Sequence, residues 1–121
     1  MKHNFRELRI WKASIRLTKE IYKLTNQFPK EEMFGLTNQL RRCAVSVASN
    51  IAEGCGRDSD KQLVNYLNFS MGSICEMETQ IILARELNYI SKEISDQMLV
   101  KIDDLEKMIF SFKRTIKNNI S

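Results

Sequence analysis

The fold of this chain depends on residues 46–57, which read SVASNIAEGCGR. Small and β-branched residues fill the first half of the stretch, and an Asn, a Glu, two glycines and an Arg follow. The four-residue spacing of Val47 and Ile51 is typical of one helix face, whereas Gly54 and Gly56 are typical helix breakers. The stretch therefore predicts a corner where one helix ends shortly before another begins.

The 121 residues have a mass of 14.2 kDa, and we expect a single domain, residues 1–121. A single proline and four glycines leave few turns for an all-β fold. No stretch is long and apolar enough to span a membrane, and the N-terminus lacks a secretory signal, so we expect no membrane partner. The three cysteines, Cys43, Cys55 and Cys75, are not closely spaced, which favours reduced thiols in a cytoplasmic protein.

Apolar residues recur every three or four positions in four segments, about 6–26, 32–53, 60–87 and 92–117. This period predicts four amphipathic helices. Ser59 and Ser91 are suited to cap the third and fourth helices, and Asn88 is suited to the left-handed residue that follows the third. Four long helices with short loops bury their apolar faces most simply in an all-α, antiparallel up-down four-helix bundle.

The helix predicted for residues 6–26 carries two apolar stripes and one row of cations. The second apolar stripe indicates either a wide buried face or a surface for another subunit, and it consists of Leu8, Trp11, Ile15 and Tyr22. The cations, which we call the basic ridge, recur at spacings of three and four: Arg9, Lys12, Arg16, Lys19 and Lys23. The ridge is either a solvated helix face or an anion-binding surface. The net charge of +4, concentrated in residues 1–61, favours an anionic partner.

Catalytic and metal-binding patterns are not evident in the sequence. The single histidine, His3, lies at a terminus that we expect to be frayed. Its position excludes histidine-dependent triads and the Glu-x-x-His ligands of di-iron bundles. The cysteines lack the spacing of zinc ligands. We therefore expect no enzyme activity, no cofactor and no metal.

The polar cluster Asn50, Glu53 and Arg57 allows two interpretations. Glycine amides and a helix N-terminus beside the cluster would suit a bound phosphate. Alternatively, the three side chains satisfy the backbone groups of the corner and pair with one another, and this structural role is favoured. Cys55, close to Arg57 and to a helix start, is either a reactive thiol or, in the favoured interpretation, an inert exposed one.

Short motifs that keep their order and spacing cover residues 5–91. They are LRIWKA (8–13), IY (21–22), FP (28–29), GL (35–36), QLRR (39–42), SNIAEG (49–54), GR (56–57), GS (72–73), Glu76 and LNYI (87–90). With these motifs the chain resembles the four-helix-bundle protein family of bacterial 23S rRNA intervening sequences. Ala48 departs from the family, in which many members have proline there, so we expect a straighter helix.

The resemblance implies a bundle that assembles as a homopentamer. It also implies a relation to the accessory bundle protein of diversity-generating retroelements, a pentameric barrel that binds nucleic acid and works with a reverse transcriptase.

These features predict a non-enzymatic, ring-shaped homo-oligomer that binds RNA or DNA without sequence preference through the basic ridge. No base readout is expected, because the sequence shows no aromatic-rich platform for single strands. The alternative is a scaffold that docks a partner protein on the second apolar stripe and has no nucleic-acid role.

Overall fold

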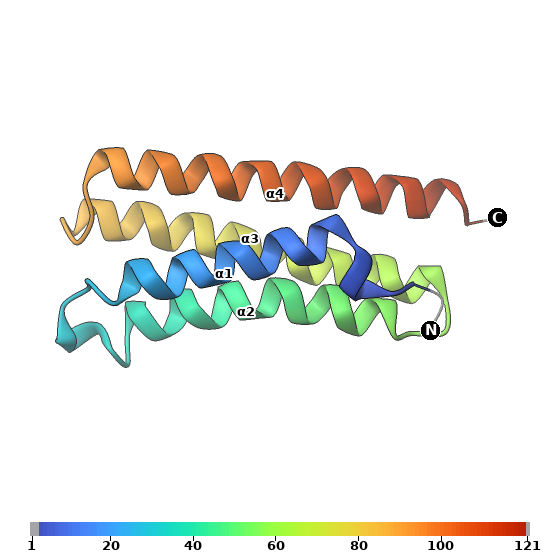
Figure 1. The fold of residues 1–121 in the computed structure, drawn as a ribbon, viewed down its shortest axis with the longest axis horizontal. Coiled ribbons are helices and arrows are strands. Elements are labelled where there is room, and N and C mark those ends of the chain that lie inside the picture. Colours follow the sequence, from blue (N-terminus) through green and yellow to red (C-terminus); the bar gives the residue numbers. More distant parts are fainter. Residues whose placement is uncertain (1–2, 121) are drawn as a thin grey trace.

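The computed structural model describes residues 3–120, and this part of the chain contains helices and no strands (Figure 1). Its four α-helices are α1 (Arg9–Thr25), α2 (Leu36–Cys55), α3 (Asp60–Glu86) and α4 (Lys92–Asn118). Two short 3₁₀ helices, η1 (Phe5–Glu7) and η2 (Lys30–Glu32), precede α1 and α2. The prediction of an all-α fold with four helices is confirmed. None of the helices in the described residues is both long and apolar enough to cross a membrane.

The four helices lie side by side along the long axis of the molecule (Figure 1). The connections from α1 to α2 and from α3 to α4 lie together at one end, on the left of the view, which we call the loop end. The connection from α2 to α3 lies at the opposite end, together with the start of α1 and the end of α4. We call this second end the corner end.

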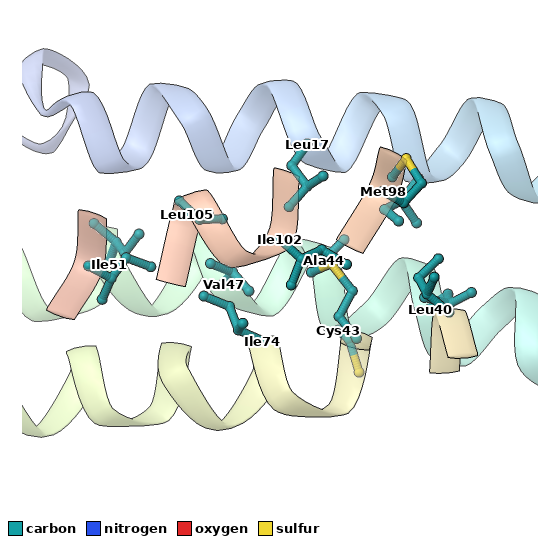
Figure 2. Packing of buried hydrophobic residues seen from close by; sticks show 14 of the residues in the cluster. Leu17, Leu40, Cys43, Ala44, Val47, Ile51, Ile74, Met98, Ile102 and Leu105 are labelled. Atoms are coloured by element: carbon teal, nitrogen blue, oxygen red, sulfur yellow. The ribbon is translucent and has the colours of Figure 1, made fainter. Parts of the chain in front are cut away.

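The core runs through the centre of the bundle and receives aliphatic side chains from every helix. Figure 2 shows Leu17 of α1, Val47 of α2, Ile74 of α3 and Ile102 of α4 meeting in the interior. None of the four is more than 4% exposed. Burial of such a side chain contributes about 1.5–3 kcal/mol, so this interior is the main source of the bundle's stability.

The first helix begins later than its apolar pattern predicts, and the second begins at the later of two starts that the pattern allows, Glu32 and Leu36. The pattern places the first start near residue 6, but α1 begins at Arg9, because η1 occupies the residues before it, as η2 does before α2. Before α1, the Phe5 ring packs edge-on against Trp11, with 5.3 Å between the ring centroids. Before α2, the Glu32 carboxylate accepts a hydrogen bond of 3.0 Å from the Leu36 backbone N–H. A side chain of η2 therefore caps α2.

The prediction that Gly54 breaks the second helix is wrong. Gly54 is buried inside α2, and Gly56 follows the last residue of the helix. The reason is close packing, since a Cβ on Gly54 would lie 2.8 Å from Leu63 Cδ1 and 2.8 Å from Tyr66 Cβ. Gly54 thus allows α2 and α3 to approach each other at the corner end. The same helix continues without interruption through Ala48.

The predicted caps of α3 and α4 are confirmed. The Ser59 hydroxyl accepts a hydrogen bond of 3.2 Å from the Gln62 N–H, and the Ser91 hydroxyl accepts one of 3.1 Å from the Ile94 N–H. Asn88 has a φ of 63°, the left-handed conformation that asparagine tolerates better than most residues. These local signals fix where the third helix ends and where the fourth begins.

Candidate nucleic-acid interface

The basic ridge lies on the solvent side of α1. All five of its side chains are exposed: Arg9, Lys12, Arg16, Lys19 and Lys23. The direction of the ridge is fixed because the opposite side of α1, which includes Leu17 and Ile21, is buried in the core. Within residues 3–120, none of the five cations forms an ion pair. Their charges are therefore available to an external anion.

An open groove runs beside the ridge, between α1 and α4. Its larger part has a volume of about 650 Å³ and a floor that includes Ala13, Leu17, Leu105 and Met108. Charged side chains of both helices border this part: Arg16, Lys19, Glu20, Lys23, Lys101 and Asp104. A polyanion bound in this groove would contact an apolar floor and a rim that is mainly cationic.

A second opening of about 620 Å³ continues the groove towards the corner end. Arg9 of the ridge and Lys107 of α4 both border it, and Met108 lines both openings. Four of the five ridge cations thus border the groove, whereas Lys12 lines neither opening. The α4 cations Lys101 and Lys107 lie across the groove from the ridge, where Lys101 pairs with Glu20 and Lys107 with Asp103. Sequence reasoning missed them, because their place is apparent only once α4 is packed beside α1.

One ion pair crosses the groove. The Lys101 ammonium donates a hydrogen bond to the Glu20 carboxylate, and both side chains are nearly half exposed. Exposed ion pairs stabilise proteins by about 0–1 kcal/mol, so this contact holds α1 and α4 together only weakly. Its main consequence is electrostatic, because Glu20 neutralises one cation of a groove that Asp104 and Glu7 also border.

The polar residues of the α2–α3 corner separate into two groups. Arg57 donates hydrogen bonds to the Glu53 carboxylate and, at 2.6 Å, to the Tyr66 hydroxyl. Asn50 instead donates to the Ser46 backbone carbonyl at 2.9 Å and to the Ser46 hydroxyl at 3.0 Å. The structure therefore brings Glu53 and Arg57 together, while Asn50 makes its hydrogen bonds one helical turn earlier in α2.

The backbone amides of the corner are engaged in ending α2. The Gly56 N–H donates to the carbonyls of Ala52 and Glu53, each at 3.2 Å, and the Arg57 N–H donates to the Gly54 carbonyl at 3.2 Å. Amides that are bonded in this way do not point at a ligand. The arrangement supports the structural role of the corner over a phosphate site.

The interpretation of Cys55 as an exposed thiol is wrong. Cys55 is 1% exposed, and its burial raises its pKa to about 11. Cys43 is also buried, and burial followed by the neighbouring Glu76 raises its pKa to about 11. Only Cys75 is exposed among these cysteines. A protonated, buried thiol is a poor nucleophile, so Cys55 contributes to packing.

The expectation of a frayed N-terminus at His3 is also wrong. The His3 Nε2 atom lies 3.0 Å from the Asp60 Oδ1 atom at the start of α3. The His3 ring also packs edge-on against Phe112 of α4, with 6.4 Å between the ring centroids. These contacts tie His3 to the corner end. Within residues 3–120, His, Cys, Asp and Glu side chains form no group of three or more that is placed to hold a metal ion.

Comparisons with known proteins agree with this architecture. The chain is similar to a crystal structure of a protein of unknown function from the S23 ribosomal protein family of Bacteroides thetaiotaomicron. The TM-score is 0.79 and the sequence identity 21%, over 86% of this chain and 97% of that chain, a likeness that shows the fold alone. No curated protein matches the chain. A model of the family described as 23S rRNA-intervening sequence protein matches residues 6–111. Since this match spans most of the chain, the protein belongs to the 23S rRNA-intervening sequence protein family.

Proposed function

We propose that the protein is a non-enzymatic, cytoplasmic bundle protein that binds RNA or DNA through the basic ridge and the α1–α4 groove. The observation that carries the proposal is the row of exposed ridge cations, none of which forms an ion pair within the described residues. On the far side of the groove, Lys101 and Lys107 are each paired with a carboxylate, Glu20 and Asp103, so the free charge lies on the ridge. An extended polyanion satisfies such a row better than a single small anion does.

Contacts of this kind bind phosphates and not bases. Lysine and arginine side chains that meet the backbone fix the position of a nucleic acid but carry no sequence information. Each neutralised phosphate releases counterions, so the affinity falls steeply with salt, with a logarithmic slope of about −0.7 to −0.9 per contact. Binding is therefore expected to tolerate sequence changes and to weaken strongly as salt rises.

Charge reversal on the ridge tests this proposal. In fluorescence anisotropy at low salt, wild-type protein should bind mixed-sequence RNA and DNA, and the triple variant Arg9→Glu, Lys12→Glu, Arg16→Glu should lose at least about tenfold in affinity. A control with the same change in net charge is Lys30→Glu, Arg42→Glu, Lys92→Glu, at exposed positions outside the groove. The control should retain most of the affinity. Absence of binding at low salt, or equal losses in the two triple variants, would refute the proposal.

Glu20 offers a change in the opposite direction. It is the carboxylate that pairs with Lys101 across the groove, so Glu20→Gln frees a cation and removes a negative charge. We expect the affinity for nucleic acid to rise a few-fold at low salt and the gain to disappear at high salt, because the effect is screened. A variant that binds more weakly would contradict the placement of the nucleic acid in this groove.

We further propose that antiparallel bundles of this kind assemble into a ring-shaped homo-oligomer, with five copies as the resemblance implies. The second apolar stripe of α1 supports self-association, because Ile15 is 36% and Tyr22 41% exposed although both are large and apolar in character. A ring repeats the ridge in every subunit, which raises avidity without any new contact. Light scattering should give a multiple of 14.2 kDa at micromolar concentration, and a monomer mass would refute the assembly.

The alternative function, a protein-binding scaffold, rests on the same exposed stripe. A scaffold would retain a specific protein partner after nuclease treatment and in high salt, and would lose it when Tyr22 is changed to Glu. Nucleic-acid binding predicts the reverse, since the ligand would be sensitive to both treatments.

A further inference from the structure

The outer surface of α3 and α4 is divided by charge. Every acidic residue after Asp60 falls within residues 76–106, and residues 61–75 and 107–120 contain none. Those two segments lie beside each other at the corner end (Figure 1), where the Lys113 ammonium donates a hydrogen bond of 3.1 Å to the Asn68 side chain. They carry five cations: Lys61, Lys107, Lys113, Arg114 and Lys117. The acidic residues of 76–106 offset these cations in the net charge of the C-terminal half, so the basic region is not apparent from the net charge.

Two exposed aromatic rings lie in the same region. Phe69 of α3 is 58% exposed and Phe110 of α4 is 50% exposed. The Phe69 ring packs edge-on against Tyr66 at 5.5 Å, and the Arg57 guanidinium lies 4.9 Å from the centroid of the Tyr66 ring. The environment of Phe69 thus combines an aromatic neighbour with the Arg57 guanidinium, which also pairs with Glu53.

Phe110 has cations as its neighbours. The Lys113 ammonium lies 5.6 Å and the Arg114 guanidinium 5.9 Å from the centroid of its ring. Because half of the Phe110 side chain is exposed to solvent, a planar ligand could stack on the exposed face of its ring. The nearby positive charges also favour a ligand that carries phosphates.

Three side-chain amides line the same pocket as Phe69. An open pocket of about 390 Å³ is bordered by Arg57, Gln62, Asn65, Tyr66, Asn68 and Phe69. Asn and Gln amides both donate and accept hydrogen bonds, as the edges of unpaired nucleobases require. Exposed aromatic rings provide stacking that every base can use.

We propose that Phe69, Phe110 and the amides beside them form a stacking surface for the unpaired bases of single-stranded nucleic acid. The inference rests on the proposed function, in which the basic ridge holds the phosphate backbone. It departs from the expectation, drawn from the sequence, that the protein has no aromatic platform. The two rings are far apart in sequence, and in the sequence each is next to residues of the core stripe. Only the packing of α3 against α4 brings them into one basic region.

The last turns of α4 connect this surface with the groove. Lys107 borders the α1–α4 groove, Lys113 and Arg114 lie beside the Phe110 ring, and Lys113 also donates to Asn68 of α3. A single strand that leaves the groove therefore meets cations along α4 before it reaches the exposed rings. A duplex, whose bases are already stacked and paired, gains nothing from the rings.

The experiment compares a labelled single-stranded RNA with the same RNA annealed to its complement, by fluorescence anisotropy at one low salt concentration. The double variant Phe69→Ala, Phe110→Ala should bind the single strand at least about fivefold more weakly and bind the duplex as the wild type does. Phe69→Trp should retain single-strand affinity. The matched control is Phe34→Ala, which removes a ring that is 93% exposed but lies between η2 and α2, away from the pocket.

The possible outcomes separate this inference from the proposed function. Unchanged single-strand affinity in the double variant, or equal losses for single strand and duplex, would refute stacking while leaving binding by the ridge intact. Absence of wild-type binding to both ligands would refute the proposed function and the stacking surface with it. Circular dichroism melting checks that the variants remain folded, which we expect because both rings are half or more exposed.

Discussion

The seam between α2 and α3 and the seam between α1 and α4 are built from different side chains. At the α2–α3 seam, the Ser70 hydroxyl donates to the Val47 backbone carbonyl at 2.9 Å, and the Ser46 and Ser73 hydroxyls lie 2.9 Å apart. At the α1–α4 seam, long charged side chains border an open groove. Short side chains permit helices to touch along their backbones, whereas long ones hold them apart and keep a surface accessible.

This difference separates stability from binding. We call the α2–α3 seam the closed seam and the α1–α4 seam the open seam. The closed seam includes Gly54, where a side chain larger than hydrogen would overlap Leu63. The open seam is crossed by one exposed ion pair, Glu20 with Lys101, which contributes little to folding. We infer that the α2–α3 seam mainly maintains the fold and that the α1–α4 seam is free to serve a ligand.

The largest expected effect is in thiol reactivity. At pH 7.5 a maleimide should modify exposed Cys75 rapidly and buried Cys55 at least about 1000-fold more slowly, because the buried thiol of Cys55 reacts only when the structure around it opens. Time-resolved mass spectrometry measures both rates. The Cys75→Ser variant should lack the fast phase, and full denaturation should make all cysteines reactive. Rapid modification of Cys55 in the native protein would show that the core around the end of α2 opens readily, unlike a seam that maintains the fold.

Leucine and methionine truncations compare the buried core with the open α1–α4 seam. Leu67 of α3 is 0% exposed, so Leu67→Ala should lower the free energy of unfolding by about 2–5 kcal/mol. Met108 is only partly buried beside the groove, so Met108→Ala should cost about 1 kcal/mol or less. Chemical denaturation at a fixed protein concentration gives both values. Equal losses would mean that the α1–α4 seam is as tightly packed as the rest of the core.

Two glycines test the closed seam on its own. Gly54→Ala should destabilise the protein by about 1–3 kcal/mol, since the new methyl group would overlap Leu63 and Tyr66. Gly72 lies inside α3 with nothing within 4 Å of an added Cβ. Gly72→Ala should therefore stabilise by about 0.5–1 kcal/mol through helix propensity. Melting temperatures that change in the same direction for both variants would contradict this account of Gly54.

Local features were predictable from the sequence because they depend on neighbours in the chain. The helix face with Val47 and Ile51, the caps Ser59 and Ser91, and the left-handed Asn88 all follow from spacing and residue type within a few positions. The basic ridge is local in the same sense, since one helix sets its geometry.

Features that join distant segments were not predictable in this way. The groove requires Lys101 and Lys107 to lie beside α1, and the stacking surface requires Phe110 to lie in the same region as Phe69. Gly54 was misread for a related reason. In the sequence, a glycine that ends a helix cannot be distinguished from a glycine near a helix end that lets a neighbouring helix pack closely.

The smallest expected effect concerns a contact at the loop end, outside both seams. The Glu32 carboxylate caps α2 and accepts a hydrogen bond of 2.7 Å from the Tyr89 hydroxyl, which joins the loop before α2 to the loop before α4. The Leu36 N–H and then the Tyr89 hydroxyl hold the pKa of Glu32 below its ordinary value of 4.5. Because the folded state favours the ionised form, the contribution of Glu32 is present above pH 4.5 and is lost as the pH falls through its lowered pKa.

The Glu32→Gln variant should therefore melt below the wild type at pH 7, and the difference should shrink as the pH is lowered from about 5 towards 3. Glu31→Gln, at the exposed neighbouring position, should follow the wild-type dependence. Circular dichroism melts across this range provide the measurement. Parallel curves for wild type and Glu32→Gln would mean that the carboxylate contributes no pH-dependent stability, and that the two loops are joined by the packing of Phe28 against Tyr89 alone.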